Sequence, residues 1–244
     1  MTESRIASEL NNRIASIEIN RPDKRNALDG EMFAALANAL RVAQDNPHVH
    51  CVVLRGAGDH FCSGHDIAAF GALWPQAADG AIRRCIAAFA EQRKPLVAAV
   101  TGSAIGFGAT MLLHADWVAA GERAVFRFPF ADLGIVPEAG ATALLARRVG
   151  DLAARDWLMS GRPISAAEAL QHGFVSCVIP DADVHAAAND YAARLAAKPP
   201  EALQATRRLL LDGSTLTARD AIEREVSYLN AFIPAIVSAS SSHG

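Results

Sequence analysis

Cysteine is scarce in this chain of 244 residues, and neither sign of charge dominates. Four cysteines are too few to form a disulfide framework in a chain of this size. The N-terminal residues also lack the apolar core of a secretory signal, so the sequence predicts a protein of the reducing cytoplasm. There are 23 basic and 26 acidic residues and no long run of either sign, which argues against nucleic acid as a partner.

Long uncharged runs are also rare. Residues 96–113 carry no charge and reach the length at which a membrane span must be considered. Three glycines and the hydroxyl residues Thr101, Ser103 and Thr110 interrupt this stretch. Such a composition favours a buried strand, a glycine turn and a buried helix over a helix in lipid. No membrane contact is therefore expected.

The chain is rich in apolar residues, which make up 51% of it and can fill one hydrophobic core. A hairpin is predicted over residues 5–19 with its turn at Asn11-Asn12, and Asp29 is placed to cap the helix that follows. Three strand-loop-helix units come next, with strands near 51–54, 96–100 and 124–128. Helices dominate the remainder, and no linker rich in Gly, Ser and Pro divides the chain. The pattern predicts one α/β unit.

Five segments of this chain, taken in order, resemble the crotonase (enoyl-CoA hydratase/isomerase) superfamily. They are NRPDKRNALD at 20–29, VVLRGAGDHFCSGHDI at 52–67, KPLVAAVTGSAIGFGATMLLHAD at 94–116, FRFPFADLGIVPEAG at 126–140 and EALQHGFVSCVI at 168–179. The resemblance departs from the family after Asn230, where the usual acidic-glycine ending is missing.

The resemblance implies an α/β fold, the crotonase (ClpP-like) spiral of ββα units with a helical C-terminal region. Residues 1–195 would form the spiral core and residues 196–244 a helical trimerisation region, within one structural unit. A homotrimer or a dimer of trimers is expected, and the many alanines and leucines from Asp151 onward are a modest physical hint of association. The implied partner is an acyl-CoA thioester. Since coenzyme A is part of that substrate, no separate cofactor is expected.

A thioester enolate needs two hydrogen-bond donors fixed where negative charge develops on the carbonyl oxygen. By resemblance, these donors are the backbone N–H groups of His65 and Phe107. Each lies in a glycine-bearing loop that follows a predicted buried strand, and Phe107 is also expected at the start of a helix, whose dipole would help. The alternative is that Gly64, Gly106 and Gly108 only make tight turns.

The same resemblance implies a coenzyme A site in two loops. In the first loop the cations of Lys24 and Arg25 would meet phosphates, although a solvated basic turn explains them equally well. The other residues implied in coenzyme A binding are Ala27, Leu28, Ser63, His65, Asp66 and Ile67, of which the last two would line the adenine pocket.

A metal site and a nucleophilic triad are both disfavoured in the second loop. His60, Cys62, His65 and Cys51 resemble loose metal ligands, but their spacing matches no compact zinc pattern, so no metal is expected. Near-neighbours in one loop rarely converge with the geometry of a Ser-His-Asp triad. The His65 side chain is therefore interpreted as solvated or core-lining.

The choice of reaction depends on carboxylates. The two glutamates of hydratases in this family correspond here to Thr110 and Phe130, which would instead line the substrate pocket and cannot act as carboxylate bases. Glu138, in the run VPEAG, resembles the base of peroxisomal-type Δ3,Δ2-enoyl-CoA isomerases. Desolvation would raise its pKa towards a value suited to proton transfer. The alternative is that Glu138 caps the helix that begins near Ala141.

Isomerisation with Glu138 as base is therefore the favoured function. Three alternatives stay open: an enoyl-CoA hydratase, a nucleophilic CoA-thioester hydrolase or dehalogenase acting through Glu138, and a non-catalytic acyl-CoA-binding protein. An assay of 3-enoyl-CoA conversion separates these classes, and binding without turnover would favour the last.

Overall fold

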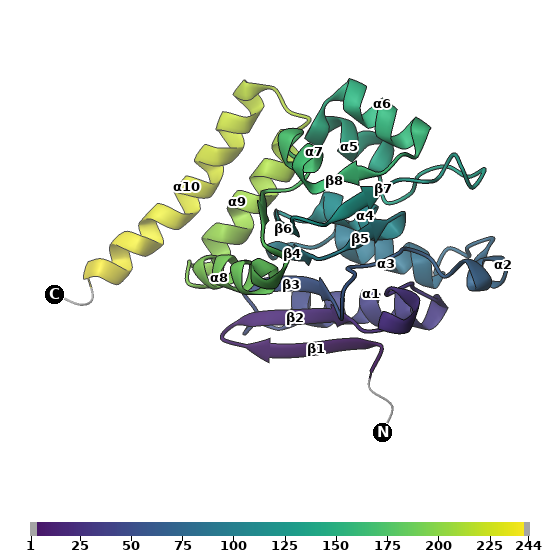
Figure 1. The fold of residues 1–244 in the computed structure, drawn as a ribbon. Helices are drawn as coiled ribbons and strands as arrows, with labels where there is room; N and C mark the ends of the chain where they lie inside the picture. Colours follow the sequence, from purple (N-terminus) through teal and green to yellow (C-terminus); the bar gives the residue numbers. More distant parts are fainter. Residues whose placement is uncertain (1–3, 242–244) are drawn as a thin grey trace.

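The computed structural model describes residues 4–241, which form two β-sheets and a set of surrounding helices (Figure 1). The larger sheet has the order β1-β2-β3-β4-β6-β9, in which β1 is antiparallel to β2 and all other pairs are parallel. Its strands are β1 (Ile6–Asn11), β2 (Ile14–Ile19), β3 (Cys51–Gly56), β4 (Leu96–Val100), β6 (Trp117–Gly121) and β9 (Cys177–Ile179). The smaller sheet has the order β5-β7-β8, with β5 (Ser103–Ile105), β7 (Val125–Arg127) and β8 (Ile164–Ser165).

Helices connect the strands and make up the C-terminal part of the described chain. The α-helices are α1 (Gly30–Asp45), α2 (Phe70–Leu73), α3 (Ala81–Ala90), α4 (Phe107–Thr110), α5 (Ala141–Val149), α6 (Asp151–Ser160), α7 (Ala166–Gln171), α8 (Val184–Ala196), α9 (Pro200–Gly213) and α10 (Ala218–Ser241). Short 3-10 turns lie at η1 (Pro22–Lys24), η2 (Ile67–Ala69), η3 (Met111–His114) and η4 (Asp181–Asp183). The α/β organisation predicted from the sequence is confirmed.

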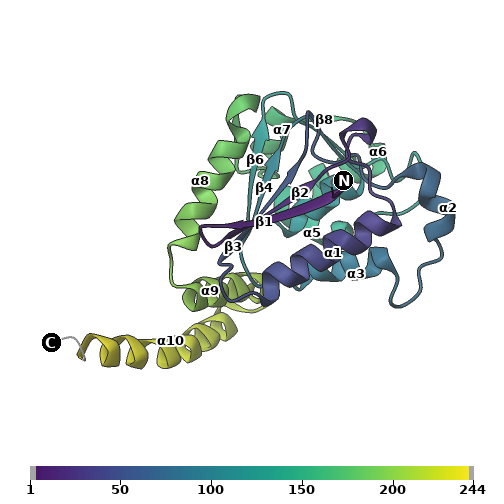
Figure 2. The same cartoon turned by 90° about the horizontal axis from the view of Figure 1, so that it is seen from below.

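Both faces of the larger sheet are buried at its centre, which explains why the parallel strands β3 and β4 are almost continuous apolar runs. Along β3, Val52 and Leu54 face the main core, whereas Val53 faces a second cluster under α8. Figure 2 shows α8 on one side of the sheet and α1 with α3 on the other. The residues that α8 buries recur every fourth position and so share one helix face: Val184, Ala188, Ala192 and Ala196.

The first hairpin and its helix form close to where they were predicted. The turn is shifted by one residue, to Asn12-Arg13, where both residues have positive φ (48° and 67°). Positive φ at both central residues is what a two-residue hairpin loop of type I′ requires, and asparagine tolerates this conformation better than most residues. Asp29 caps α1, because its carboxylate accepts a hydrogen bond from the Met32 N–H at 3.0 Å.

The uncharged stretch 96–113 does not form one helix. It divides into β4, the short strand β5, the single turn α4 and a 3-10 turn, and its middle crosses from the larger sheet to the smaller one. The rejection of a membrane-spanning helix here is confirmed. Among all described helices, none combines the length and apolar character needed to cross a bilayer.

The C-terminal helices attach to the body through α9. Arg207, which is 7% exposed, pairs with Asp116 at 2.8 Å and donates to the backbone carbonyls of Gln92 and His114. By contrast, α10 packs along α9 and then extends away from the rest of the molecule (Figure 1). One side of α10 therefore lacks a partner within the described chain.

Candidate active site

Two loops that follow parallel strands of the larger sheet are bonded to each other. The Cys62 N–H donates to the Ser103 carbonyl at 3.0 Å, and the Ile105 N–H donates to the Cys62 carbonyl at 2.9 Å. The first loop follows β3, and the second follows β4. Because β3 and β4 are neighbours, their carboxyl ends deliver both loops to the same edge of the sheet.

Gly64 is required by this close approach. Its φ is +85°, and a Cβ at this position would lie 2.6 Å from the Ile105 carbonyl oxygen and 3.3 Å from the Phe107 nitrogen. Gly108 is equally constrained, since a Cβ there would lie 2.1 Å from the Cys62 carbonyl oxygen. These glycines do more than form turns, because they bring the two predicted donor positions together.

The backbone N–H groups of His65 and Phe107 have no acceptor within residues 4–241, although their neighbours in both loops are bonded. Gly64, the residue before His65, lies close to the Phe107 nitrogen, since a Cβ built on it would be 3.3 Å from that atom. Two donors without an acceptor, in loops that are bonded to each other, are what an oxyanion hole needs. The expected contribution of a helix dipole is small, because α4 is only one turn long before it tightens into a 3-10 turn.

Glu138 reaches the same turn from a distant part of the chain. Its Oε1 accepts a hydrogen bond from the Thr110 hydroxyl at 2.7 Å, and Thr110 follows Phe107 by three residues on α4. Its Oε2 is buried and has no partner among the described residues. Burial raises the pKa of Glu138 from 4.5 to about 7, against a smaller lowering by the Thr110 hydrogen bond.

The alternative role for Glu138 as a helix cap is not supported. Gly140 occupies the cap position of α5, without a side-chain hydrogen bond, and the Ala141 N–H bonds to the backbone carbonyl of Glu138 instead. The Glu138 side chain is thus turned inward, towards Thr110.

Near the positions that correspond to the two glutamates of hydratases, the other residues provide no second carboxylate base. Phe130 is 4% exposed and part of the main core, so it makes its surroundings apolar. Asp132, the next carboxylate along the chain, pairs with Arg127 at 2.9 Å, and its side chain is about half exposed. Within the described chain, no charged group is among the causes that shift the pKa of Glu138.

The two loops implied in coenzyme A binding are also bonded together. The Ser63 N–H donates to the Arg25 carbonyl at 3.0 Å, and the Ser63 hydroxyl donates to the Lys24 carbonyl at 3.2 Å. The side chains of Lys24 and Arg25 are exposed, whereas Ala27 and Leu28 are buried. The loops therefore present two cations to solvent, while the residues that follow them in the first loop are buried.

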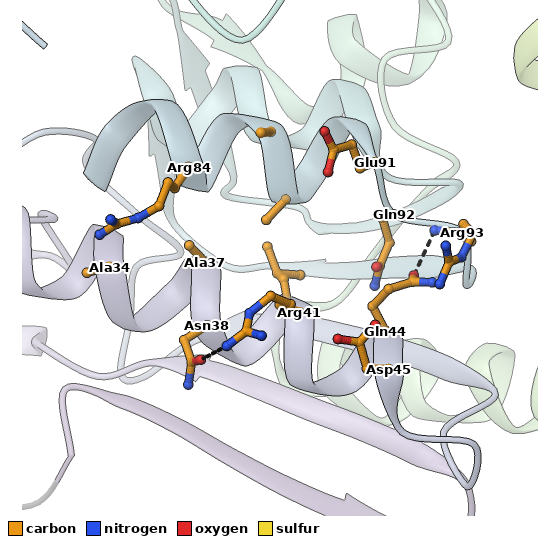
Figure 3. Close-up of a pocket in the computed structure, with 13 residues that line it drawn as sticks. Ala34, Ala37, Asn38, Arg41, Gln44, Asp45, Arg84, Glu91, Gln92 and Arg93 are labelled. Atoms are coloured by element: carbon orange, nitrogen blue, oxygen red, sulfur yellow. Dashed lines mark hydrogen bonds between the residues drawn. The ribbon is translucent and has the colours of Figure 1, made fainter. Parts of the chain in front are cut away.

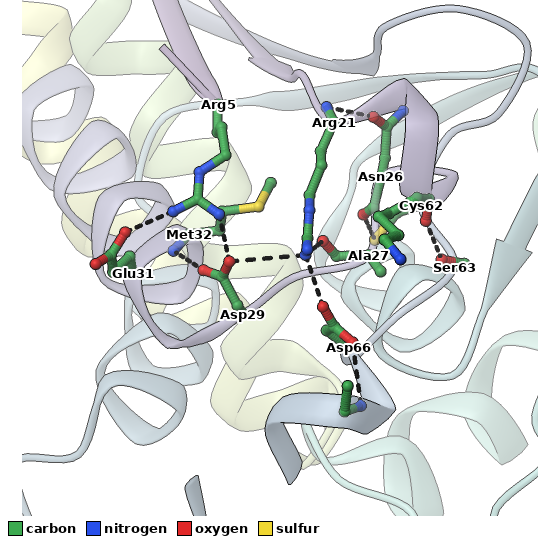
Figure 4. A network of polar contacts seen from close by, with 12 residues as sticks. Arg5, Arg21, Asn26, Ala27, Asp29, Glu31, Met32, Cys62, Ser63 and Asp66 are labelled. Carbon is green, nitrogen blue, oxygen red and sulfur yellow. Dashed lines mark hydrogen bonds and ion pairs between the residues drawn. The ribbon is translucent and has the colours of Figure 1, made fainter. Parts of the chain in front are cut away.

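Arg21 and Asn26, which sequence reasoning missed, hold this arrangement (Figure 4). The Arg21 guanidinium bonds the Asp66 carboxylate at 2.8 Å and the Ala27 carbonyl at 3.2 Å. Asn26 is fully buried, and its amide bonds backbone groups of Arg21 and of the loop after β3. Asp66 also caps the next turn, so its carboxylate is already engaged. Ile67, in contrast, is 70% exposed.

The His65 side chain lines the core, which is one of the two arrangements that the sequence predicted for it. It packs against aromatic rings, and burial lowers its pKa to about 4. The residues whose spacing resembles loose metal ligands do not converge: His60 bonds Ser103, and Cys62 bonds the Asn26 carbonyl. No group of three possible metal ligands is found among the described residues, and all four cysteines are free thiols.

A separate hollow of about 630 Å³ lies between α1 and α3 (Figure 3). Arg41, Gln44, Arg84 and Arg93 line it, and the Gln44 side chain accepts a hydrogen bond from the Arg93 N–H at 2.8 Å. None of the residues of the candidate site lines this hollow. It is therefore not the place where Glu138 and the two N–H donors would act.

The comparisons identify this chain as an acyl-CoA enzyme. The chain belongs to the enoyl-CoA hydratase/isomerase family, the crotonase superfamily, because the model of that family matches residues 9–238. It is 39% identical over 197 residues to the probable enoyl-CoA hydratase EchA14 of Mycobacterium tuberculosis, covering 80% of this chain and 76% of that protein. It is 32% identical over 224 residues to enoyl-CoA delta isomerase 2 of Rattus norvegicus, covering 89% of this chain and 57% of that protein.

Solved structures agree with this assignment. A protein described as an enoyl-CoA hydratase/carnithine racemase from Magnetospirillum magneticum AMB-1 superposes with a TM-score of 0.90 at 35% identity, covering 100% of this chain and 96% of that one. The predicted crotonase fold, with its two sheets and C-terminal helices, is confirmed.

Proposed function

We propose that this protein is a Δ3,Δ2-enoyl-CoA isomerase in which Glu138 is the single proton shuttle. The observation that carries the proposal is the Glu138 side chain, with Oε1 held by Thr110 and Oε2 buried without a partner. Because burial raises the pKa of Glu138 to about 7, it is half ionised near neutral pH and can both take and return a proton.

The reaction needs one base and one oxyanion hole. The Glu138 carboxylate takes the proton from C2 of a 3-enoyl-CoA, and the electrons of that C–H bond delocalise towards the thioester oxygen as a dienolate. The N–H groups of His65 and Phe107 stabilise the negative charge on that oxygen. Glu138 then returns the proton to C4, and the double bond moves to C2–C3. No water is consumed.

Hydration is the competing reaction, since relatives with both names are found. By resemblance, hydratases hold one water between two glutamates, and this chain has Thr110 and Phe130 at those positions. Thr110 is engaged with Glu138, and Phe130 is buried in the core. A water at Glu138 would thus lack a second carboxylate, so hydration of crotonyl-CoA should be much slower than isomerisation.

Glu138→Gln tests the proposal directly, because it keeps the shape of the side chain and removes the base. Its rate on trans-3-hexenoyl-CoA should fall at least ~10²-fold, while affinity for saturated acyl-CoA stays similar. Asp132→Asn is the matched control, since Asp132 is a surface carboxylate paired with Arg127, and it should keep the native rate. A Glu138→Gln enzyme that isomerises at the native rate would remove Glu138 from the mechanism.

Deuterium exchange distinguishes this function from its alternatives. In D₂O the native enzyme should exchange a C2 proton of a bound saturated thioester, and Glu138→Gln should not. Turnover of crotonyl-CoA to the 3-hydroxy product faster than 3-enoyl-CoA isomerisation would favour the hydratase. Binding without any exchange or turnover would favour the acyl-CoA-binding protein.

We also propose that residues 196–244 mediate a homotrimer or a dimer of trimers. The support is α10, whose exposed apolar residues have no cover within the described chain: Ile222, Val226, Leu229 and Ile233, each 44–55% exposed. Analytical ultracentrifugation at micromolar concentration tests this proposal, and a stable monomer would contradict it.

A further inference from the structure

The His65 imidazole has no task in the mechanism proposed above. It lies in a cage of three phenylalanine rings, with ring centroids 4.7 Å from Phe33, 5.5 Å from Phe70 and 5.9 Å from Phe107. These rings come from α1, α2 and α4, so the imidazole is placed where three helices meet the loop of the proposed oxyanion hole.

One nitrogen of this imidazole is both buried and unpaired within the described chain. Nε2 is buried and has no hydrogen-bond partner within residues 4–241. The three phenylalanine rings around it carry no polar group that could serve as one. A buried polar atom without a partner destabilises a fold, so packing alone would favour leucine or phenylalanine at this position.

The imidazole is also uncharged under physiological conditions, because burial lowers the pKa of His65 to about 4. A neutral imidazole has one N–H donor and one acceptor nitrogen. It can therefore exchange a hydrogen bond with a neutral oxygen, but it cannot hold a carboxylate or a phosphate through its charge.

We infer that His65 Nε2 is a specificity determinant that bonds a hydroxyl or carbonyl oxygen on the acyl chain of the substrate. The inference rests on the proposed function, because the acyl chain approaches this cage only if the N–H groups of His65 and Phe107 hold the thioester oxygen. One residue then makes two contacts, through its backbone to the thioester and through its ring to a substituent further along the chain.

The preferred substrate class is accordingly an oxygenated acyl-CoA. A plain hydrocarbon chain would leave Nε2 unpaired in the complex, whereas an oxygen at the right carbon would pair it. A site built to hydrogen-bond a substrate oxygen discriminates strongly against analogues that lack it, since its own polar group is then left unsatisfied.

Binding of saturated thioesters tests the inference without turnover. Isothermal titration would compare hexanoyl-CoA with 4-, 5- and 6-hydroxyhexanoyl-CoA. The wild-type protein should bind at least one hydroxylated ligand about tenfold more tightly than hexanoyl-CoA, as a buried hydrogen bond allows. His65→Phe retains the backbone N–H and an aromatic ring but lacks Nε2, so it should lose this preference.

Phe33→Leu is the matched control, because it alters the cage and leaves Nε2 in place, and it should keep the preference. Melting temperatures check the fold, and His65→Phe should melt no lower than wild type, since it removes an unpaired polar atom. If that variant does not fold, His65→Leu serves in its place.

The outcomes separate this inference from the proposed function. Equal affinity of the wild-type protein for all four thioesters, or an unchanged preference in His65→Phe, overturns the role of His65 and leaves the isomerase proposal intact. If none of the four thioesters binds, acyl-CoA recognition itself fails, and the inference fails with it.

Discussion

Replacing Glu138 with glutamine should stabilise the folded protein, and should do so more strongly as the pH rises. Burial raises the pKa of Glu138 from 4.5 to about 7 in the folded state. The unfolded chain releases this proton near pH 4.5, whereas the native protein keeps it until about pH 7. Between these values the native state binds more protons than the unfolded state, so the free energy of unfolding falls as the pH rises.

The size of the effect follows from the shift in pKa. At pH 8 the native carboxylate is ionised, and its burial costs about 3 kcal/mol of folding stability; at pH 5 the cost is only about 1 kcal/mol. Glutamine can still accept the Thr110 hydrogen bond and carries no charge. Its advantage over glutamate should therefore be about 2 kcal/mol larger at pH 8 than at pH 5, or roughly 4–8 °C in Tm for a chain of this size.

Calorimetric melting of wild type and Glu138→Gln between pH 5 and 8.5 measures this difference. Protein concentration must be fixed, because association shifts apparent stability. Asp132→Asn serves as the reference, since removal of an exposed carboxylate paired with Arg127 should not make the gap widen with pH. A gap between Glu138→Gln and wild type that stays constant from pH 5 to 8 would mean that Glu138 ionises like an exposed carboxylate, and would refute the reasoning.

Three further predictions concern the site. The Thr110 hydrogen bond lowers the pKa of Glu138, so Thr110→Val should move the rising limb of kcat/KM to higher pH, whereas Thr110→Ser should restore it. Gly64→Ala should reduce the isomerisation rate at least ~10²-fold and lower Tm, because its Cβ would meet the Ile105 carbonyl at 2.6 Å in a residue with φ of +85°. Arg21→Ala should raise KM for acyl-CoA with little change in kcat, since Arg21 bridges the two proposed coenzyme A loops. Steady-state kinetics measure both constants, and a fall in kcat alone would contradict this prediction.

Much of the fold could be predicted from the sequence because its signals are local. Long apolar runs mark strands that are buried on both faces, and glycines mark the loops that follow them. The smaller sheet as a whole could not be found in this way, although its strand β7 lies within the stretch 124–128 that was predicted as a strand. Its other strands, β5 and β8, have three and two residues, which is too short for any periodicity, and the sheet exists because distant segments meet.

The candidate site also has a part that the sequence predicts and a part that depends on contacts between distant residues. The positions of the donors at His65 and Phe107 could be proposed from glycine spacing and family resemblance, since their chemistry belongs to the backbone. The partner of Glu138 could not, because Thr110 lies 28 residues away and makes contact only in the folded chain. The Arg21–Asp66 pair spans 45 residues, and nothing in the pattern distinguishes Arg21 from the basic residues beside it.

Three groups that lack a partner among the described residues lie on or beside the turn α4. It carries the Phe107 N–H, its Thr110 holds the glutamate whose other oxygen is free, and its Phe107 ring packs against the imidazole of His65. A buried polar group without a partner costs about 1–3 kcal/mol, so several around one turn oppose folding. The surrounding sheet, buried on both faces, supplies the stability that tolerates them. A thioester oxygen, a transferable proton and an acyl oxygen would satisfy these three groups together, which is why the isomerase proposal and the role inferred for His65 concern the same turn.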